Sequence, residues 1–310
     1  MLIRRPRFEI PAREITPEAL VLNRRALMGA GAALLPATAL AQAAPGLPEH
    51  QRNLRFRPER DLTPEREATS YNNFYEFGTS KSIAREAARM PVRPWRLSVG
   101  GLAAKPREFE MDDLLRLLPI EERVYRLRCV EAWAMTVPWS GFQLSELLKL
   151  VEPQSGARFV AFETASIPSV MPGLRQSWYP WPHVEACTIE EAANELTFMP
   201  VGLYGKPLPQ QNGGPVRVVF PWKYGFKSGK SVVKITLTAE RPRTFWPAIQ
   251  ANEYGFWANV NPEVAHPRWS QATERLLGSG ERVPTRLFNG YAEQVGSLYG
   301  DALRRDRIWF

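Results

Sequence analysis

Short stretches in which apolar and polar residues alternate recur along this chain of 310 residues. Alternation of this kind, rich in β-branched and aromatic residues, predicts β-strands. The stretches are 95–101, 124–127, 158–163, 197–204, 215–221 and 231–238. Apolar residues at helical spacing predict short helices at 111–118, 144–151 and 189–196, the first ended by Pro119. Short helices, many strands, long loops and no strand–helix–strand rhythm indicate an α+β fold with mixed sheets.

The first 43 residues differ in character from the rest. Arg24 and Arg25 precede an apolar, alanine-rich run at 26–41, which ends in small residues. This layout is typical of a cleaved signal peptide, and the run is too short to cross a bilayer comfortably. The arginine pair indicates a twin-arginine signal, which exports folded proteins, although a general secretory signal with an incidental pair remains an alternative. We therefore predict a signal peptide at 1–43 and one catalytic domain at 44–310, located in the periplasm.

The composition indicates a globular protein with a substantial core. It is 44% apolar and 11% aromatic, and 28 prolines favour long, ordered loops. The formal net charge is +8, but residues 1–43 contain six arginines and three glutamates, so the remainder carries only about +5. Since the chain has neither a long basic run nor a nucleic-acid-binding motif, nucleic acid is not an expected partner.

The two cysteines lie in different contexts. Cys129 follows the strand-like run at 124–127 and begins a Trp-rich segment that we interpret as an irregular loop. This position favours a thiolate with a chemical role, although a lone cysteine also commonly serves as a small buried hydrophobe. Cys187 lies just before a helix start and is interpreted as structural. A disulfide between Cys129 and Cys187 remains open as an alternative.

Two further segments carry candidate binding residues. The sequence WKYGFKSGK at 222–230 contains two glycines, a serine and three lysines, which can surround an anion with N–H groups and ammonium ions. It lacks the Walker spacing, and a solvated basic hairpin is the alternative. Arg217 offers a planar fork suited to phosphate. The segment YNNFYEFG at 71–78 has no regular period and is expected to be a loop or the wall of a ligand site.

Four features together closely resemble a known family. They are the twin-arginine leader, YNNFYEFG, RCVEAW around Cys129, and PQQNGGPVR followed by PWKYGFKSGKS between 209 and 231. The family comprises the molybdopterin-containing catalytic subunits of periplasmic protein-methionine-sulfoxide reductases, in the sulfite oxidase fold superfamily. The resemblance implies that Cys129 is a thiolate ligand of molybdenum and that the enedithiolate of the pterin supplies two more sulfurs.

The resemblance also implies which residues bind the molybdopterin cofactor. They are Asn72, Tyr75, Glu76, Thr164, Asn212, Arg217, Ser228, Gly229 and Lys230. Val130, Glu131, Ala132 and Trp133 follow Cys129, where sulfite-oxidising relatives have a Gly-Asn-Arg type of run. This difference favours reduction of a sulfoxide over oxidation of sulfite.

The implied activity is repair of methionine sulfoxide in oxidised periplasmic proteins by oxygen-atom transfer to molybdenum. The chain has no CxxCH motif, so its electrons are expected from a membrane haem subunit linked to the quinone pool. Alternatives are a reductase of small S-oxides or N-oxides, a cysteine-dependent hydrolase, and a periplasmic binding domain without activity. The hydrolase would need a histidine beside Cys129.

Several residues receive weaker interpretations. His183 and His266 are interpreted as structural. Glu131 is a candidate proton relay, with an exposed salt bridge as the alternative. Four tryptophans are candidates for the mouth of the site, with packing as the alternative for each: Trp133, Trp139, Trp178 and Trp181.

Overall fold

The computed structural model describes residues 46–300, 308 and 309. The description below concerns the unit Gly46–Phe310. The predicted signal peptide and the domain boundary at 43 and 44 lie outside the described residues. No helix among the described residues is long and apolar enough to cross a membrane.

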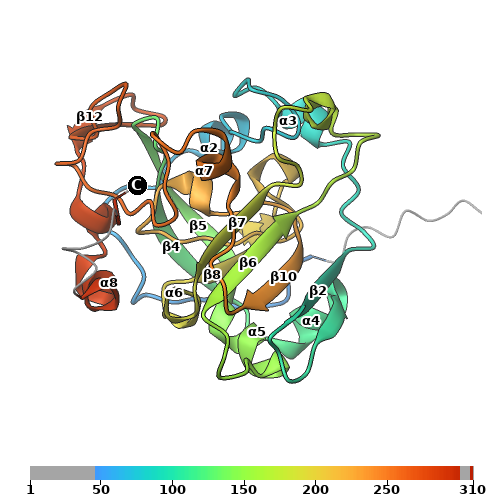
Figure 1. Cartoon of the computed structure of the whole chain (residues 1–310). Helices are drawn as coiled ribbons and strands as arrows, with labels where there is room; N and C mark the ends of the chain where they lie inside the picture. The colour runs from blue at the N-terminus through green and yellow to red at the C-terminus, as the bar shows by residue number, and fades with distance from the viewer. Residues whose placement is uncertain (1–45, 301–307, 310) are drawn as a thin grey trace, which may run out of the picture. The chain divides into compact units, whose positions relative to one another are not determined.

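The larger sheet is mixed and is built around the antiparallel pair β4 and β5, which the turn at Cys129 connects (Figure 1). β11, from near the C-terminus, pairs in parallel with β5, and β8 pairs with β5 further along. The strands of this sheet are β1 (Gln51–Arg52), β4 (Glu121–Arg128), β5 (Trp133–Gln143), β8 (Phe198–Leu203), β9 (Lys206–Pro207), β11 (Thr273–Leu276) and β12 (Arg282–Pro284).

The smaller sheet has the order β3-β2-β10-β6-β7, and Figure 1 shows β6 beside β10. β10 pairs in parallel with β2, and the other neighbours are antiparallel. The strands are β2 (Arg96–Gly101), β3 (Arg107–Glu110), β6 (Phe159–Thr164), β7 (Val184–Thr188) and β10 (Val232–Thr238). β6 ends at Thr164, one of the predicted cofactor-binding residues.

The helices are short. The α-helices are α2 (Glu65–Ser70), α3 (Ala84–Ala87), α4 (Met111–Leu117), α5 (Leu144–Val151), α6 (Ile189–Ala193), α7 (Phe245–Ile249) and α8 (Ala292–Tyr299), and the 3-10 helices are η3 (Pro172–Arg175), η4 (Gln210–Asn212), η5 (Gly225–Lys227) and η6 (Leu287–Gly290). α6 begins with a capping box, in which the Thr188 side chain accepts from the Glu191 N–H and the Glu191 carboxylate accepts from the Thr188 N–H.

The α+β prediction is confirmed, and two local predictions are wrong. The segment 215–221 does not form a regular strand; it makes one isolated bridge, between Val219 and Phe198. The N–H groups of Arg217, Val218 and Val219 donate to the oxygens of Pro200, Gly229 and Phe198 in turn, so no continuous ladder with one neighbouring strand forms. The Trp-rich segment after Cys129 is not an irregular loop but the long strand β5, which is buried on both faces and therefore shows no alternation. The helix predicted at 189–196 ends at Ala193.

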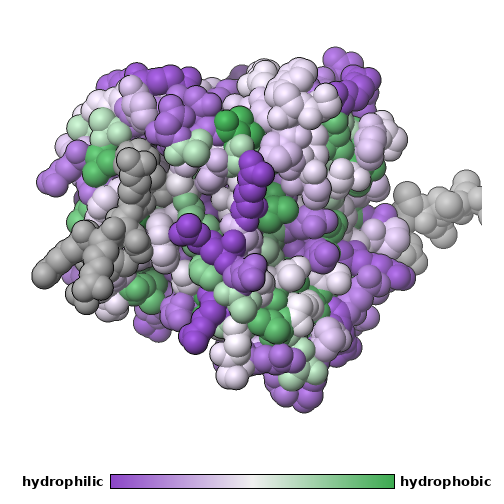
Figure 2. Space-filling view, viewed as in Figure 1, coloured by the Kyte–Doolittle hydropathy of each residue, from purple (hydrophilic) through white to green (hydrophobic). Residues whose placement is uncertain are grey.

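The hydrophobic core includes every methionine of the described chain. They are Met90, Met111, Met135, Met171 and Met199, with exposures between 0% and 6%. The unbranched methionine side chain adapts to irregular spaces between sheets and loops. On the face drawn in Figure 2, hydrophilic residues cover most of the surface and hydrophobic residues are scattered in small groups.

Candidate functional site

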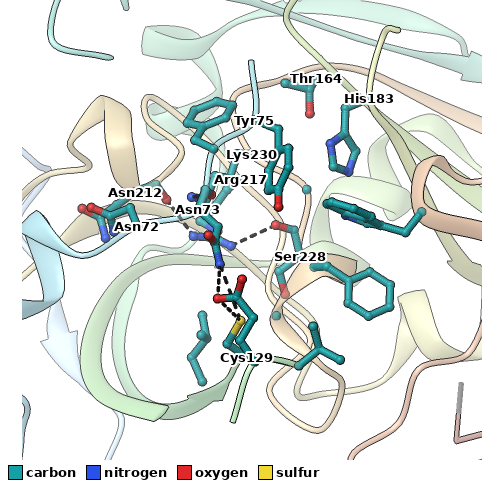
Figure 3. Close-up of a pocket in the computed structure, with 18 of the residues that line it drawn as sticks. Asn72, Asn73, Tyr75, Cys129, Thr164, His183, Asn212, Arg217, Ser228 and Lys230 are labelled. Atoms are coloured by element: carbon teal, nitrogen blue, oxygen red, sulfur yellow. Dashed lines mark hydrogen bonds between the residues drawn. The ribbon is translucent and has the colours of Figure 1, made fainter. Parts of the chain in front are cut away.

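One pocket contains all ten residues that the sequence predicts for the site (Figure 3). They reach it from the 72–76 loop, the end of β4, the end of β6 and the segment 212–230. The pocket holds about 910 Å³ of space not filled by atoms, part of it open to solvent. The residues are Asn72, Tyr75, Glu76, Cys129, Thr164, Asn212, Arg217, Ser228, Gly229 and Lys230. Their roles toward a cofactor remain predictions, but their grouping is a feature of the fold.

A tight turn between β4 and β5 positions Cys129. The Cys129 N–H donates to the main-chain oxygen of Trp133 at 2.9 Å, and the Ala132 N–H donates to the oxygen of Cys129 at 3.1 Å. Ala132 has φ = 61°, a left-handed conformation uncommon for a residue with a side chain. The turn places the Cys129 thiol in the pocket wall, with Cys129 only 7% exposed.

The thiol of Cys129 has two polar neighbours. Its Sγ lies 3.6 Å from Nδ2 of Asn73 and 3.7 Å from Oε2 of Glu131. Burial opposes ionisation of Glu131, but hydrogen bonds from Lys81, Asn73 and Trp133 outweigh it and lower the pKa of this carboxyl group. Burial, followed by the charge of Glu131, raises the pKa of the Cys129 thiol to about 12. The thiolate therefore needs a nearby cation, such as a bound metal, to form at neutral pH.

The geometry weakens the hydrolase and disulfide alternatives. No histidine in the described chain hydrogen-bonds to Cys129, so the thiol lacks the base that a cysteine hydrolase requires. Both cysteines are free and buried, and Cys187 lies in β7, as expected for a structural residue.

His183, which the sequence analysis interprets as structural, lines the pocket. Its Nδ1 is 3.7 Å from Oε1 of Glu76, and its Nε2 is 3.6 Å from Oε1 of Glu185. The ring stacks on Phe245 with centroids 4.2 Å apart. Nothing in the local sequence, where His183 follows Pro182, indicates this position.

Two asparagine side chains of the pocket donate hydrogen bonds to the same main-chain oxygen. Nδ2 of Asn72 and Nδ2 of Asn212 both donate to the main-chain oxygen of Ala68, at 3.2 and 3.0 Å. Their Oδ1 atoms are buried and find no hydrogen-bond partner in the described chain. The same holds for Asn73 Oδ1, Glu76 Oε1 and His183 Nε2.

A buried polar atom without a partner costs about 1–3 kcal/mol, so several around one pocket indicate a polar ligand. Three of the five are amide oxygens, which accept hydrogen bonds. A heterocycle rich in N–H groups, such as a pterin, could donate hydrogen bonds to these amide oxygens.

Two cations line the pocket, the buried Arg217 and the partly buried Lys230. The guanidinium of Arg217 donates to the main-chain oxygens of Asn212 at 2.7 Å and Ser228 at 2.9 Å. Burial lowers the pKa of Arg217 to about 9, which leaves it cationic at neutral pH. Burial, and then the charge of Arg217, lower the pKa of Lys230 well below its ordinary value. An anionic group in the pocket would offset these effects, so the wall fits a phosphate.

The prediction that three lysines of 222–230 surround an anion is wrong for two of them. Lys223 pairs with Glu191, and Lys227 pairs with Glu185 at 2.8 Å; all four side chains are buried. Of the three lysines, only Lys230 lines the pocket. The acidic partners belong to α6 and β7, so the local sequence carries no sign of them. The hydrated-hairpin alternative is also excluded, because both lysines are buried.

The tryptophan predictions divide. Trp133 lines the pocket, whereas Trp139 is fully buried in β5. Trp178 is 72% exposed, and neither it nor Trp181 lines the pocket. Nine further lining residues were not site candidates from the sequence: Asn73, Phe74, Leu127, Val130, Met135, Gly225, Phe226, Trp246 and Tyr254. Asn73 lies within the 71–78 segment, whose irregular pattern was the available signal.

The chain matches the family model of the oxidoreductase molybdopterin binding domain over residues 86–246. It is 47% identical to the protein-methionine-sulfoxide reductase catalytic subunit MsrP of Pseudomonas syringae pv. tomato, with 94% of this chain and 96% of that protein covered. It is 49% identical to the MsrP of Burkholderia mallei, with 94% and 93% covered.

Among solved structures, the chain is similar to the sulfane dehydrogenase SoxCD from Paracoccus pantotrophus. The TM-score is 0.45 and the sequence identity is 16%, with 89% of this chain and 65% of that chain covered. A similarity at this level carries no information on function.

Proposed function

The chain belongs to the molybdopterin-binding oxidoreductases, in the family of protein-methionine-sulfoxide reductase catalytic subunits, and we propose that it reduces methionine sulfoxide in proteins with a molybdenum centre. One observation carries the proposal. Cys129 lies in the wall of a pocket where buried amide oxygens lack partners in the described chain and two cations, the buried Arg217 and the partly buried Lys230, line the same space.

The residues present fit this cofactor. Cys129 would provide the single protein sulfur to the metal, the amides of Asn72 and Asn212 would accept hydrogen bonds from the pterin, and Arg217 and Lys230 would balance its phosphate. The described chain has no group of three or more His, Cys, Asp or Glu residues arranged to hold a metal. When bound, the molybdenum–pterin group supplies a two-electron centre able to accept an oxygen atom.

The reaction consumes two electrons and two protons, and it converts a sulfoxide to a thioether and water. The ion pair of Lys81 and Glu131 is suited to deliver the protons, with the Lys81 ammonium as the donor, because the lowered pKa of Glu131 keeps that group a carboxylate. Their ion pair has side chains 24% and 32% exposed, and it reaches from solvent to the neighbourhood of the Cys129 thiol. Apolar side chains from Phe226 and Trp246 in the pocket wall restrict water.

The location and the electron donor are further parts of the proposal. The leader with Arg24 and Arg25 supports export in the folded state to the periplasm. The absence of a CxxCH motif supports an external source of electrons, for which we propose a membrane haem subunit linked to quinol. Replacement of both arginines by lysine tests the export route, with the protein expected to remain in the cytoplasm in its loaded form. Normal export of that variant would contradict it.

The cofactor is tested by elemental mass spectrometry and pterin fluorescence on protein made in a host that synthesises molybdopterin. We expect about one molybdenum per chain in the wild type and a weakened or altered centre in Cys129→Ser, because the metal loses its thiolate. Cys187→Ser, which removes the other thiol, is the matched control and should retain the metal. Folded wild-type protein without molybdenum or pterin would refute the proposal.

The substrate is tested with a reduced dye as electron donor, so that no partner protein is needed. Oxidised protein and free methionine sulfoxide should both be reduced, with a thioether as product. A higher kcat/KM for dimethyl sulfoxide or trimethylamine N-oxide would instead assign the chain to small S-oxides or N-oxides.

A further inference from the structure

Trp178 is the most exposed large hydrophobic residue of the described chain, at 72%. It lies in the 165–183 loop that connects β6 to β7. The other strongly exposed large hydrophobics among the described residues are all leucines: Leu54, Leu62, Leu117 and Leu287. An indole left in water forgoes a large burial energy, and where it continues into neighbouring exposed apolar side chains the surface is typical of an interaction site.

The loop that carries Trp178 is fixed to the pocket wall. The Gly173 N–H donates to the main-chain oxygen of Glu76 at 2.8 Å. The Gln176 N–H donates to the oxygen of Gly173, and Nε1 of Trp181 donates to the oxygen of Gln176, both at 3.0 Å. These bonds connect the loop to a pocket residue through a chain of short-range contacts. The exposed indole is therefore held in a defined position relative to the pocket.

A series of aromatic rings connects Trp178 to the pocket. The centroid of Trp178 is 5.9 Å from that of Tyr179, which is 6.0 Å from that of Tyr75 in the pocket wall. Tyr179 also stacks on Phe245 at 5.7 Å, and Trp181 lies 5.0 Å from Phe245. Phe245 is only 2% exposed and supports both rings from inside the fold. We call Trp178, Tyr179 and Trp181 the aromatic platform. It is an apolar surface that continues from the pocket to solvent.

We propose that the aromatic platform binds the polypeptide on one side of the methionine sulfoxide, with Trp178 packing on an apolar side chain of the substrate. The inference rests on the proposed function and adds to it a preference for substrates that carry an apolar residue near the methionine sulfoxide. The occupant is an extended protein segment, because the platform is continuous with the pocket that receives the sulfoxide. Two ring-to-ring steps correspond to about three to five extended residues, which sets the spacing between the sulfoxide and the apolar side chain.

The test compares three substrates with a reduced dye as electron donor. They are free methionine sulfoxide, a nine-residue Gly/Ser peptide with a central methionine sulfoxide and Phe four residues away, and the same peptide with Gly in place of Phe. Trp178→Ala should lower kcat/KM for the Phe peptide about tenfold, through KM, because truncation of a packed indole commonly costs that much in binding. The values for free methionine sulfoxide should change less than about twofold.

Two variants serve as controls. Trp178→Phe should retain most of the preference for the Phe peptide, because a ring remains. Leu117→Ala, which removes an exposed apolar side chain of α4 at 53% exposure, should change nothing. Binding of the product peptide, measured by fluorescence anisotropy, should show the same differences without turnover.

Four outcomes would overturn the inference while leaving the proposed function intact. In the first, the wild type does not distinguish the Phe peptide from the Gly peptide. In the second, Trp178→Ala reduces activity equally on all three substrates. In the third, Trp178→Ala affects only electron delivery from membranes, which would assign the platform to the electron donor. In the fourth, the variant loses only binding to lipid vesicles. Absence of any sulfoxide reduction by the wild type would instead refute the proposed function itself.

Discussion

Nε1 of Trp269 donates a hydrogen bond to the main-chain oxygen of Val130, the residue after Cys129, at 2.7 Å. Nε2 of Gln271 donates to the same oxygen at 2.9 Å, and the guanidinium of Arg128 donates to the main-chain oxygen of Cys129. Trp269 and Gln271 lie beyond the matched family region, which ends at residue 246. The C-terminal part of the chain therefore holds the turn that presents the thiol.

A double-mutant cycle on this turn should show strong coupling. Trp269→Phe and Gln271→Leu each leave the Val130 oxygen with one donor, so the loss of that bond should lower the free energy of unfolding by about 1 kcal/mol in each. Gln271→Leu should cost more in total, because Oε1 of Gln271 also accepts from the Arg128 guanidinium at 2.8 Å. The double variant leaves a buried oxygen without a partner and should lose about 1 kcal/mol more than the sum. Urea unfolding gives the free energy of unfolding of the wild type, the two single variants and the double variant. Strict additivity would mean that the two donors do not act on one shared acceptor.

The buried ion pair of Lys227 and Glu185 makes a second prediction. Lys227→Met leaves the carboxylate buried and unpaired, so the free energy of unfolding should fall by about 3–5 kcal/mol. The double variant Lys227→Met/Glu185→Gln should recover more than half of that loss. Lys149→Met, which breaks the exposed pair with Glu146, is the control and should change stability by less than about 0.5 kcal/mol. An equal loss of unfolding free energy in the single and the double variant would show that Lys227 does not stabilise the fold through its pair with Glu185.

Gly173 makes a third prediction, because a side chain there would overlap the main-chain oxygen of Tyr75. Gly173→Ala should lower stability by about 1–3 kcal/mol, as overpacking generally does, and displace the loop that carries Tyr75 and Glu76. Gly156→Ala is the matched control, because its added carbon would meet only Leu102 at 3.7 Å. Thermal unfolding and pterin content measure the two effects. Wild-type values in both for Gly173→Ala would show that the loop accommodates the change.

The pH dependence of stability provides a fourth prediction, at His266. Its ring stacks on Trp269 at 3.8 Å, and burial lowers its pKa below the ordinary value of 6.5, despite the nearby carboxylate of Glu253. The unfolded chain therefore takes up this proton at a higher pH than the folded chain. The resulting stability is present above about pH 6.5 and falls as the pH is lowered toward the folded pKa.

His266→Phe keeps an aromatic ring at this position and should remove that component of the pH dependence. Urea unfolding between pH 7.5 and 5 would measure it in both proteins. Parallel curves for wild type and variant across this range would contradict the assignment to His266.

The sequence was informative where a residue's environment is local or where a motif is long. Alternation predicted β2, β6 and β10, because each has one face buried. It missed β5, whose residues are buried on both faces apart from Gln143, and which therefore has no period of two. It also overpredicted 215–221, where β-branched residues suggested a strand but the main-chain hydrogen bonds go to separate segments of the fold.

The site shows the same division. The motifs at 71–78, around Cys129 and at 209–231 gave nine of the ten predicted residues that share one pocket, and Thr164, at the end of β6, is the tenth. They could not show that Lys223 and Lys227 face acidic partners in other elements, or that His183 approaches Glu76. Those relationships are tertiary, because the partners are separated by long stretches of chain. The same limit applies to Trp269 and Gln271, whose bonds to the Cys129 turn have no local sequence pattern.

The buried methionines have a consequence for the chemistry proposed. Dissolved oxidants convert an accessible thioether to a sulfoxide far more readily than one enclosed in packed side chains. All five methionines of the described chain lie in the core, at no more than 6% exposure. A repair enzyme must remain active under the stress that creates its substrates. By keeping these thioethers inside, the fold makes this part of the protein a poor substrate for its own reaction.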